Sequence, residues 1–329
     1  MELTLRDALL MSHDISWLME TSAMNGIQPD NDPVITAGNL AEHMLDPDNL
    51  AARMLVLNDD DISFFEYVIR TGSVHPAAVN YRSADRLRQM NLAFITDKKR
   101  NLSVPDDLRE VYQGFDQVSF HSLRRKVSWL WDCVSLVPNF YGYMTIHDLG
   151  DMYRLKKGMD DDNAAIVMRL LPTVINHPDC LCIRQGNEII TIGLNEAGNE
   201  AKLRELHASI PLELPSYSEI KDILDHRYPS RNKAYAALRR YLIRNMKLNE
   251  YYADAMLEAV FRYIGYGNTF GDIMEMFRGE RIEVSEKQRR ELSVLMAEAW
   301  DTTRMLMCNG HRPCDVMPGN RYVFLNEEE

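Results

Sequence analysis

The amino-acid sequence is poor in cysteine and has no long apolar run. Its five cysteines are spread over 329 residues, and a chain of this length folds on a hydrophobic core without disulfides. No run of about 18 apolar residues occurs, so no membrane-spanning helix is predicted. The first residues also lack the positive start and apolar stretch of a signal peptide. We therefore expect a cytoplasmic protein that does not contact membranes.

Motifs of the common enzyme classes are also missing. None of the nine histidines lies in an H-E-x-x-H motif and no serine lies in G-x-S-x-G, so neither a metalloprotease nor an α/β-hydrolase is indicated. The glycine-rich stretch 265–271 lacks the Lys-Ser/Thr ending of a phosphate-binding loop. The sequence thus favours a protein that acts by binding, without a catalytic residue or a cofactor, over an enzyme of unidentified type.

Candidate zinc ligands occur in two places. Cys180 and Cys182 alternate on a predicted strand, and a second group consists of Cys308, His311 and Cys314. Neither group has the paired C-x2-C of most structural zinc sites, and nothing in the sequence brings the two groups together. Buried free thiols and a solvated histidine are the favoured interpretation, so no metal is predicted.

The charge of the chain is strongly negative. It has 37 basic and 49 acidic residues, which give a net charge of −12. This charge opposes non-specific attraction to polyanions. A nucleic-acid-binding site therefore requires a local excess of positive charge.

The order of predicted elements between 106 and 200 is typical of a winged helix. The first helix ends near Pro138, and its apolar face carries Val127, Leu130, Trp131 and Val134. A short extended piece follows, and Thr145 is placed to cap a helix through residue 155. An amphipathic helix at 163–176 then leads to two apolar strands around the tight turn 185–187.

A second, less complete copy of this pattern lies nearer the N-terminus. Residues 1 to about 75 show short helices, one of which has Ile62, Phe65 and Ile69 at helical spacing. A hairpin is predicted at 92–104, with a charged turn at 97–100. After residue 216 the pattern is wholly helical, with about five helices expected.

The predicted fold class is mainly α with short β-hairpins. It comprises an N-terminal helical domain ending in a β-hairpin (1–105), a winged-helix-like domain (106–200) and a C-terminal helical bundle (216–329), with 201–215 as linker.

The strongest basic segment is 226–249, which contains no Asp or Glu. Its cations are Arg227, Arg231, Lys233, Arg239, Arg240, Arg244 and Lys247. Arg240 and Arg244 are four residues apart and share a helix face. The cations could contact phosphate. The favoured alternative is that they pair with acids such as Glu250, Asp254 or Glu258 on the next helix.

A second basic segment combines a helix with the hairpin turn. Its cations are Arg82, Arg86, Arg88, Lys98, Lys99 and Arg100. A basic helix followed by a basic wing would place the helix in a major groove and the wing on flanking phosphates. The helix at 163–176, by contrast, offers only Arg169, which favours protein as its partner.

The segment 298–313, EAWDTTRMLMCNGHRP, resembles the closing helix and turn of a group of uncharacterised bacterial proteins. The region 216–279 and the hairpin end at 102–108 are similar to other parts of that group. Members often carry a zinc-binding SEC-C motif, and some begin with a segment like the N-terminal domain of the Rho termination factor. The SEC-C cysteines are missing here, so the resemblance implies a cytoplasmic bacterial protein associated with nucleic acid, without the zinc site.

The leading functional prediction is a regulatory, non-enzymatic protein that binds DNA or RNA through these two basic segments. The net acidity and the nearly uncharged helix at 163–176 support an alternative, a module that binds another protein or forms a homodimer. An acidic inhibitor of a nucleic-acid-binding enzyme, encoded by a phage or mobile element, also fits the charge.

Overall fold

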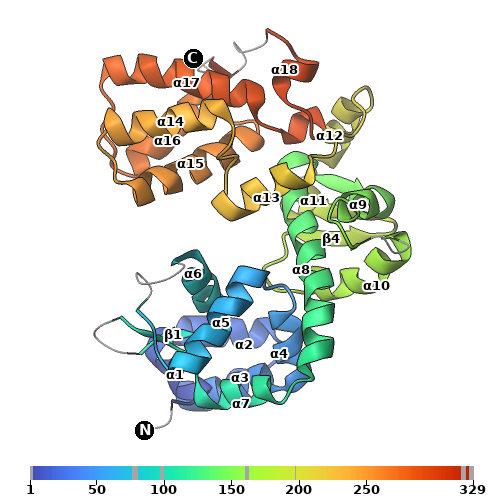
Figure 1. Cartoon of the computed structure of the whole chain (residues 1–329), viewed down its shortest axis with the longest axis vertical. Coiled ribbons are helices and arrows are strands. Elements are labelled where there is room, and N and C mark those ends of the chain that lie inside the picture. The colour runs from blue at the N-terminus through green and yellow to red at the C-terminus, as the bar shows by residue number, and fades with distance from the viewer. Residues whose placement is uncertain are drawn as a thin grey trace. The chain divides into compact units, whose positions relative to one another are not determined.

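The computed structural model describes residues 3–75, 81–96, 100–159, 163–196, 198–319 and 324–325. These residues are mainly helical, with two small antiparallel sheets (Figure 1). The predicted mainly α class with short β-hairpins is confirmed at this level. None of the helices within the described ranges is long and apolar enough to cross a membrane.

The chain divides into two compact units, Met1–Trp131 and Asp132–Glu329. The boundary falls inside one long helix, α8 (Gln117–Phe140). The three-domain division expected from the sequence has boundaries near 105 and 200, neither of which coincides with this one, and it stays a prediction.

Short helices and one small hairpin form the N-terminal unit. Side chains of Thr4, Asp14, Asp32, Asp46 and Asn58 accept backbone hydrogen bonds at the N-termini of its first helices, as N-cap residues do. The helices are α1 (Leu5–Ser12), α2 (Ile15–Met24), α3 (Pro33–Leu45), α4 (Pro47–Met54), α5 (Asp59–Thr71), α6 (Tyr81–Gln89), α7 (Asp106–Gln113) and the first part of α8.

Helix α5 contains the apolar stripe expected at 62, 65 and 69. Ile62 and Phe65 are buried, but Ile69 is partly exposed and Val68 takes the inward position. Because an α-helix turns once every 3.6 residues, either position could complete the stripe. Packing against the rest of the unit selects Val68.

The predicted hairpin of the N-terminal unit is present. Strand β1 (Phe94–Ile95) pairs with β2 (Leu102–Ser103) in antiparallel register, and an isolated bridge joins Val74 to Leu102. Of its turn, only Arg100 is described, with a left-handed φ of 61°. Lys98 and Lys99 lie outside the described residues.

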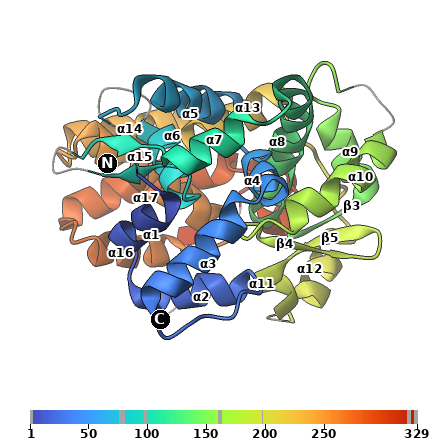
Figure 2. The same cartoon turned by 90° about the horizontal axis from the view of Figure 1, so that it is seen from below.

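The second unit contains a three-stranded sheet with strand order β3-β5-β4. Its strands are β3 (Tyr143–Thr145), β4 (Cys182–Gln185) and β5 (Glu188–Thr191). Helices α9 (Ile146–Tyr153) and α10 (Asn163–Ile175) come between β3 and β4 in the chain and lie beside the sheet (Figure 2). The side chain of Thr145 accepts the backbone N–H of Asp148 and caps α9, as expected.

The prediction that α8 ends near Pro138 was wrong by two residues. The helix includes Pro138 and continues to Phe140. Proline has no N–H to donate to the carbonyl four residues earlier, here that of Val134. The thiol sulfur of Cys182 lies 4.0 Å from this carbonyl oxygen, so the sheet offers a weak donor at the site of the missing bond.

Five α-helices fill residues 217–302, the number expected from the sequence. Ser216, Asn232, Asn249, Thr269 and Ser285 cap them. They are α13 (Tyr217–His226), α14 (Lys233–Arg244), α15 (Glu250–Gly265), α16 (Phe270–Gly279) and α17 (Glu286–Thr302). The smaller elements of this unit are α11 (Ile192–Glu196), α12 (Glu200–His207), the 3-10 turn η2 (Leu306–Cys308) and α18 (Pro313–Val316).

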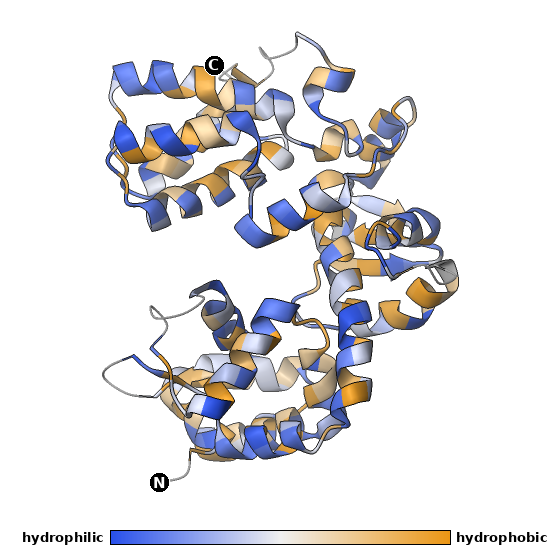
Figure 3. Ribbon diagram, in the orientation of Figure 1, coloured by the Kyte–Doolittle hydropathy of each residue, from blue (hydrophilic) through white to orange (hydrophobic). Residues whose placement is uncertain are grey.

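Several aromatic side chains pack against one another in the largely aliphatic core of the second unit. Phe261 packs edge to face on Phe140 and on Tyr235, with ring centroids 6.2 and 6.1 Å apart. Helix α14 packs on both α15 and α17. Figure 3 shows hydrophobic and hydrophilic residues alternating along these helices, as expected where one face of each meets a core.

The turn after α17 depends on a glycine. Gly310 has φ of +82°, and a Cβ there would lie 2.4 Å from the Tyr141 ring and 2.5 Å from the Glu213 carbonyl oxygen. Both the backbone conformation and the close approach exclude a side chain.

Gly310→Ala is therefore expected to lower the free energy of unfolding by about 3 kcal/mol or more, measured by urea denaturation. Gly158→Ala is the matched control, because Gly158 has φ of +86° and open space around it. It is expected to cost only about 1 kcal/mol. Equal losses in the two variants would show that the contact with Tyr141 and Glu213 is not what fixes Gly310.

Candidate functional site

The basic segment predicted at 226–249 is partly neutralised by neighbouring acids. Arg239 Nε lies 2.7 Å from Asp254 Oδ1, and its Nη2 lies 3.2 Å from Glu250 Oε2. The hydrogen bond to Asp254 raises the pKa of Arg239. Arg227 lies 3.9 Å from Glu258, and Arg231 lies 3.7 Å from Asp222. These three arginines therefore lie close to acids of the same chain, as in the alternative interpretation of this segment.

The other four cations of the segment 226–249 differ from these arginines in their surroundings. Lys233, Arg240, Arg244 and Lys247 are exposed, and within the described ranges no acidic side chain forms an ion pair with them. Lys233, Arg240 and Arg244 are seven and four residues apart, so they lie on one side of α14. The opposite side carries the buried Tyr235, Leu238 and Leu242. We refer to Lys233, Arg240 and Arg244 as the α14 cationic face.

In the predicted basic segment of the N-terminal unit, more of the cations interact with other protein groups than in α14. The Arg86 guanidinium stacks 5.5 Å from the centroid of the Trp131 ring, and Arg88 forms an ion pair of 3.2 Å with Asp85. Arg82 is partly buried and has interactions of its own. Arg100 is exposed. Arg82, Arg86 and Arg88 thus already interact with other groups of the protein. The described part of this segment therefore presents fewer cations that are open to a ligand than α14 does.

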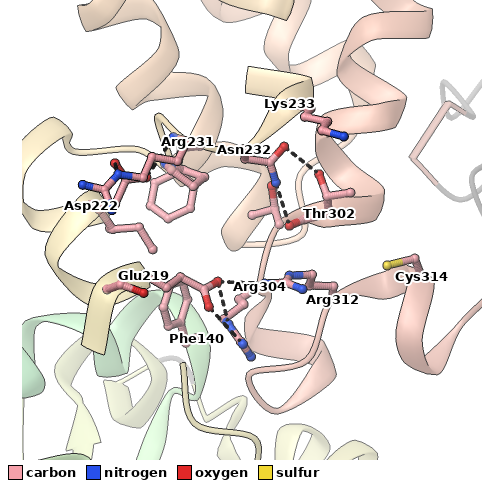
Figure 4. A pocket seen from close by; sticks show the side chains of 15 residues that line it. Phe140, Glu219, Asp222, Arg231, Asn232, Lys233, Thr302, Arg304, Arg312 and Cys314 are labelled. Atoms are coloured by element: carbon pink, nitrogen blue, oxygen red, sulfur yellow. Dashed lines mark hydrogen bonds and ion pairs between the residues drawn. The ribbon is translucent and has the colours of Figure 1, made fainter. Parts of the chain in front are cut away.

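A cavity of about 460 Å³ opens at the start of α14 (Figure 4). Side chains from α13, from the 229–233 turn and from the end of α17 onward line it. Its charged lining residues are Arg231, Lys233, Arg304, Arg312, Glu219 and Asp222. Phe140, Ile223 and Phe261 supply apolar lining and are themselves buried. Lys233 belongs both to the cavity and to the α14 cationic face.

One wall of the cavity is a buried ion-pair network around Arg304. This arginine is only 6% exposed, and its Nε and Nη2 lie 2.9 and 3.1 Å from the two carboxylate oxygens of Glu219. Its Nη1 donates to the Gly310 carbonyl at 2.6 Å, and Glu213 is a second carboxylate at 3.3 Å. Arg312 Nη2 donates to Glu219 at 3.1 Å.

The network perturbs the protonation of Glu219. Burial by itself raises the pKa of this carboxyl, but hydrogen bonds and charge from Arg304, together with the charge of Arg312, outweigh burial and hold the pKa below its usual value. Glu219 is therefore an anion that is committed to two arginines. It is not available as a general base.

Asp222, the other acid of the cavity, is similarly engaged. It is 4% exposed, and its two oxygens accept from the Ser230 hydroxyl at 2.7 Å and from the Arg231 backbone N–H at 3.0 Å. These bonds hold the turn that leads into α14, on which Arg231 and Lys233 lie.

The candidate metal ligands do not come together. Cys308 is buried, whereas Cys314 is exposed. His311 Nδ1 lies 2.5 Å from Glu213 and its Nε2 lies 2.8 Å from the Pro211 carbonyl oxygen. Partial desolvation by its neighbours and the nearby Asp315 carboxylate raise the pKa of the Cys314 thiol, which disfavours a reactive thiolate. Across the part of the chain that the structure describes, no cluster of three or more His, Cys, Asp or Glu side chains could hold a metal.

Arg304, Arg312 and Glu219 were not identified from the sequence. A signal was present, because Arg304 stands between Trp300 and the apolar run 305–308, where a charge must find a buried partner. The partner could not be found this way, because Glu219 is 85 residues distant in the chain.

Comparison with known proteins gave no match, either to a family model, to curated proteins or to solved structures. The resemblance of 298–313 to a bacterial group therefore stays a prediction.

Glu219→Gln provides a pH-dependent test of the Arg304 network. Because the folded pKa of Glu219 is depressed, its stabilisation is complete above its unfolded pKa, about 4.3, and is lost as pH falls through the folded value. At pH 7, the variant is expected to be less stable than wild type by about 3 kcal/mol, since Arg304 loses its main counter-charge. Urea denaturation from pH 7 to 3 should show this difference shrinking below about pH 4.

The control is Glu298→Gln, at an exposed acid of α17, for which a difference within about 0.5 kcal/mol is expected at every pH. A constant gap between wild type and Glu219→Gln over the whole pH range would contradict the ionic role of Glu219.

Proposed function

We propose that this chain is a nucleic-acid-binding protein that contacts the phosphate backbone with the α14 cationic face. The observation that carries the proposal is the exposure of Lys233, Arg240 and Arg244 on one side of α14 without acidic partners among the described residues. In a chain of net charge −12, the neutralisation of Arg239 on the same helix is the ordinary outcome. A face that stays unneutralised is where a polyanion is attracted.

The dimensions of the face suit a nucleic-acid strand. Eleven residues separate Lys233 from Arg244, which corresponds to about 16 Å along an α-helix. One strand of B-form DNA carries about five phosphates over this length. Lys247 lies three residues beyond the helix end and is exposed as well. Contacts of this kind fix position and supply affinity without reading the base sequence.

We also propose that α8, β3, α9, α10, β4 and β5 form a winged helix. The support is the element order helix, strand, helix, helix, strand, strand, together with the strand order β3-β5-β4. In this arrangement α10 would take the position of a recognition helix. Its exposed residues include Ala165, Met168 and Pro172, with Arg169 as an exposed cation. That surface favours a protein partner over a DNA groove.

Triple charge reversal of the α14 cationic face tests the proposed function. Wild type is expected to bind duplex DNA with a slope of log affinity against log salt of about −3 to −4, from three or four phosphate contacts. Lys233→Glu, Arg240→Glu and Arg244→Glu together should weaken binding about 100-fold or more at low salt and reduce the slope by about 2.7. Fluorescence anisotropy at several salt concentrations measures both.

The matched control reverses three exposed cations elsewhere in the second unit: Lys202→Glu, Arg278→Glu and Arg281→Glu. It changes the net charge equally, so similar weakening in both triple variants would mean that net charge alone governs binding. Reversal of Lys98, Lys99 and Arg100 tests the predicted wing separately. A flat salt response of wild type would overturn the proposal.

A protein-binding role is the second candidate, and exposed apolar side chains of the N-terminal unit favour it. Met11, Ile15 and Met24 are 59%, 55% and 76% exposed, and Val34 and Ile35 are each 48% exposed. They lie on or near α1, α2 and the start of α3. Exposed apolar side chains that form one contiguous patch are typical of a contact surface.

Sedimentation equilibrium tests this second role in its simplest form, self-association. If the apolar side chains mediate a homodimer, wild type should sediment as a dimer at micromolar concentration, and Ile15→Glu with Met24→Glu should shift it to monomer. The control Lys202→Glu should leave the dimer intact. If wild type is monomeric across the concentration range, the homodimer prediction is wrong.

A further inference from the structure

The cavity at the start of α14 has an excess of positive charge. Four cations line it, Arg231, Lys233, Arg304 and Arg312, against the two acids Glu219 and Asp222. Glu219 and Glu213 both pair with Arg304, and Asp222 approaches Arg231, so about one positive charge remains uncompensated. A phosphate monoester, which carries a charge of about −1.5 to −2 at pH 7, is attracted by this excess.

The cations differ in how freely they can meet a ligand. Arg304 is 6% exposed and all three of its nitrogens are bonded within the protein. The Arg231 side chain is 75% exposed, with only a 3.7 Å approach to Asp222. The Arg312 side chain is 38% exposed and gives Nη2 to Glu219. Arg231, Arg312 and Lys233 therefore retain N–H groups for a ligand, while Arg304 holds the wall in place.

The shape and lining of the cavity favour an organic phosphate over an inorganic ion. Its volume of about 460 Å³ falls in the range of sites for small organic ligands. Ile223 and Phe261 give it an apolar lining against which a carbon skeleton could rest, with the fully buried Phe140 behind them. Figure 4 shows Arg231 and Lys233 on the turn into α14 and Arg312 on the segment after α17, all at the border of this cavity. Guanidinium groups bind phosphate oxygens with paired hydrogen bonds.

We propose that this cavity binds a phosphomonoester group, through Arg231, Lys233 and Arg312. Two sources share this chemistry: a free phosphorylated molecule of nucleotide size, and the 5′-phosphate at the end of a nucleic-acid strand. Because Lys233 also belongs to the α14 cationic face, a strand lying along α14 would bring its end to the cavity. This second source rests on the proposed function, whereas the first does not.

The experiment compares two single-stranded oligonucleotides of the same sequence, labelled at the 3′ end, one with a 5′-phosphate and one with a 5′-hydroxyl. Binding to the full chain is followed by fluorescence anisotropy. AMP and adenosine are titrated separately by calorimetry. We expect the 5′-phosphate strand to bind about tenfold more tightly than the 5′-hydroxyl strand, and AMP to bind where adenosine does not.

Variants separate the cavity from the face. Arg231→Gln and Arg312→Gln should reduce the tenfold preference to less than twofold and leave the 5′-hydroxyl strand unaffected. Arg240→Gln, on the face but outside the cavity, should weaken both strands equally and keep their ratio. Arg231 is the decisive position, because its side chain is 75% exposed and its replacement is expected to leave the fold intact. Thermal unfolding of each variant checks this.

The outcomes distinguish the two proposals. Equal, salt-dependent binding of both strands, without AMP binding, overturns the cavity proposal and leaves the proposed function standing. AMP binding that Arg231→Gln abolishes, without binding of either strand, supports the cavity with a free phosphorylated molecule and overturns the proposed function. Absence of all binding overturns both. AMP binding that neither arginine variant alters places the ligand elsewhere and also overturns the cavity proposal.

Discussion

The Arg304 guanidinium holds together the part of the second unit on which the candidate site depends. A buried cation is costly unless its hydrogen bonds and charge are satisfied, and here Glu219, Glu213 and the Gly310 carbonyl satisfy them. These partners come from the start of α13, the segment before it and the turn after α17. The same network therefore joins distant parts of the chain and leaves Arg312 at the edge of the cavity.

Pairing with neighbouring helices determines which cations remain available. Arg239 and Arg240 are adjacent in the sequence, yet Arg239 meets Asp254 and Glu250 on α15 while Arg240 is exposed and donates to its own helix at Ala236. The 100° step between successive helical residues is enough to turn one side chain toward α15 and the other away. A basic run in the sequence therefore contains two kinds of arginine, and only one kind forms the α14 cationic face.

Local signals predicted local structure well. Thr145 caps α9, and the turn between β4 and β5 falls at the predicted glycine. The number of helices in 217–302 also followed from breaks in the pattern. The two incorrect predictions also have local causes. Pro138 was expected to end α8, but the helix continues to Phe140, and the Cys182 thiol lies near the Val134 carbonyl oxygen that Pro138 leaves without its usual N–H donor. In α5, burial fell on Val68 instead of Ile69, because spacing alone permits both.

Helix periodicity, caps and turn residues act over a few positions, so the mainly helical class, the two short hairpins and the concentrations of positive charge can be predicted from the sequence. Which of those charges are neutralised depends on the folded chain, which also brings Glu219, Arg231, Lys233, Arg304 and Arg312 around one cavity. Ion pairs and cavities form between residues far apart in the chain. Their partners are set by packing, which no local pattern encodes.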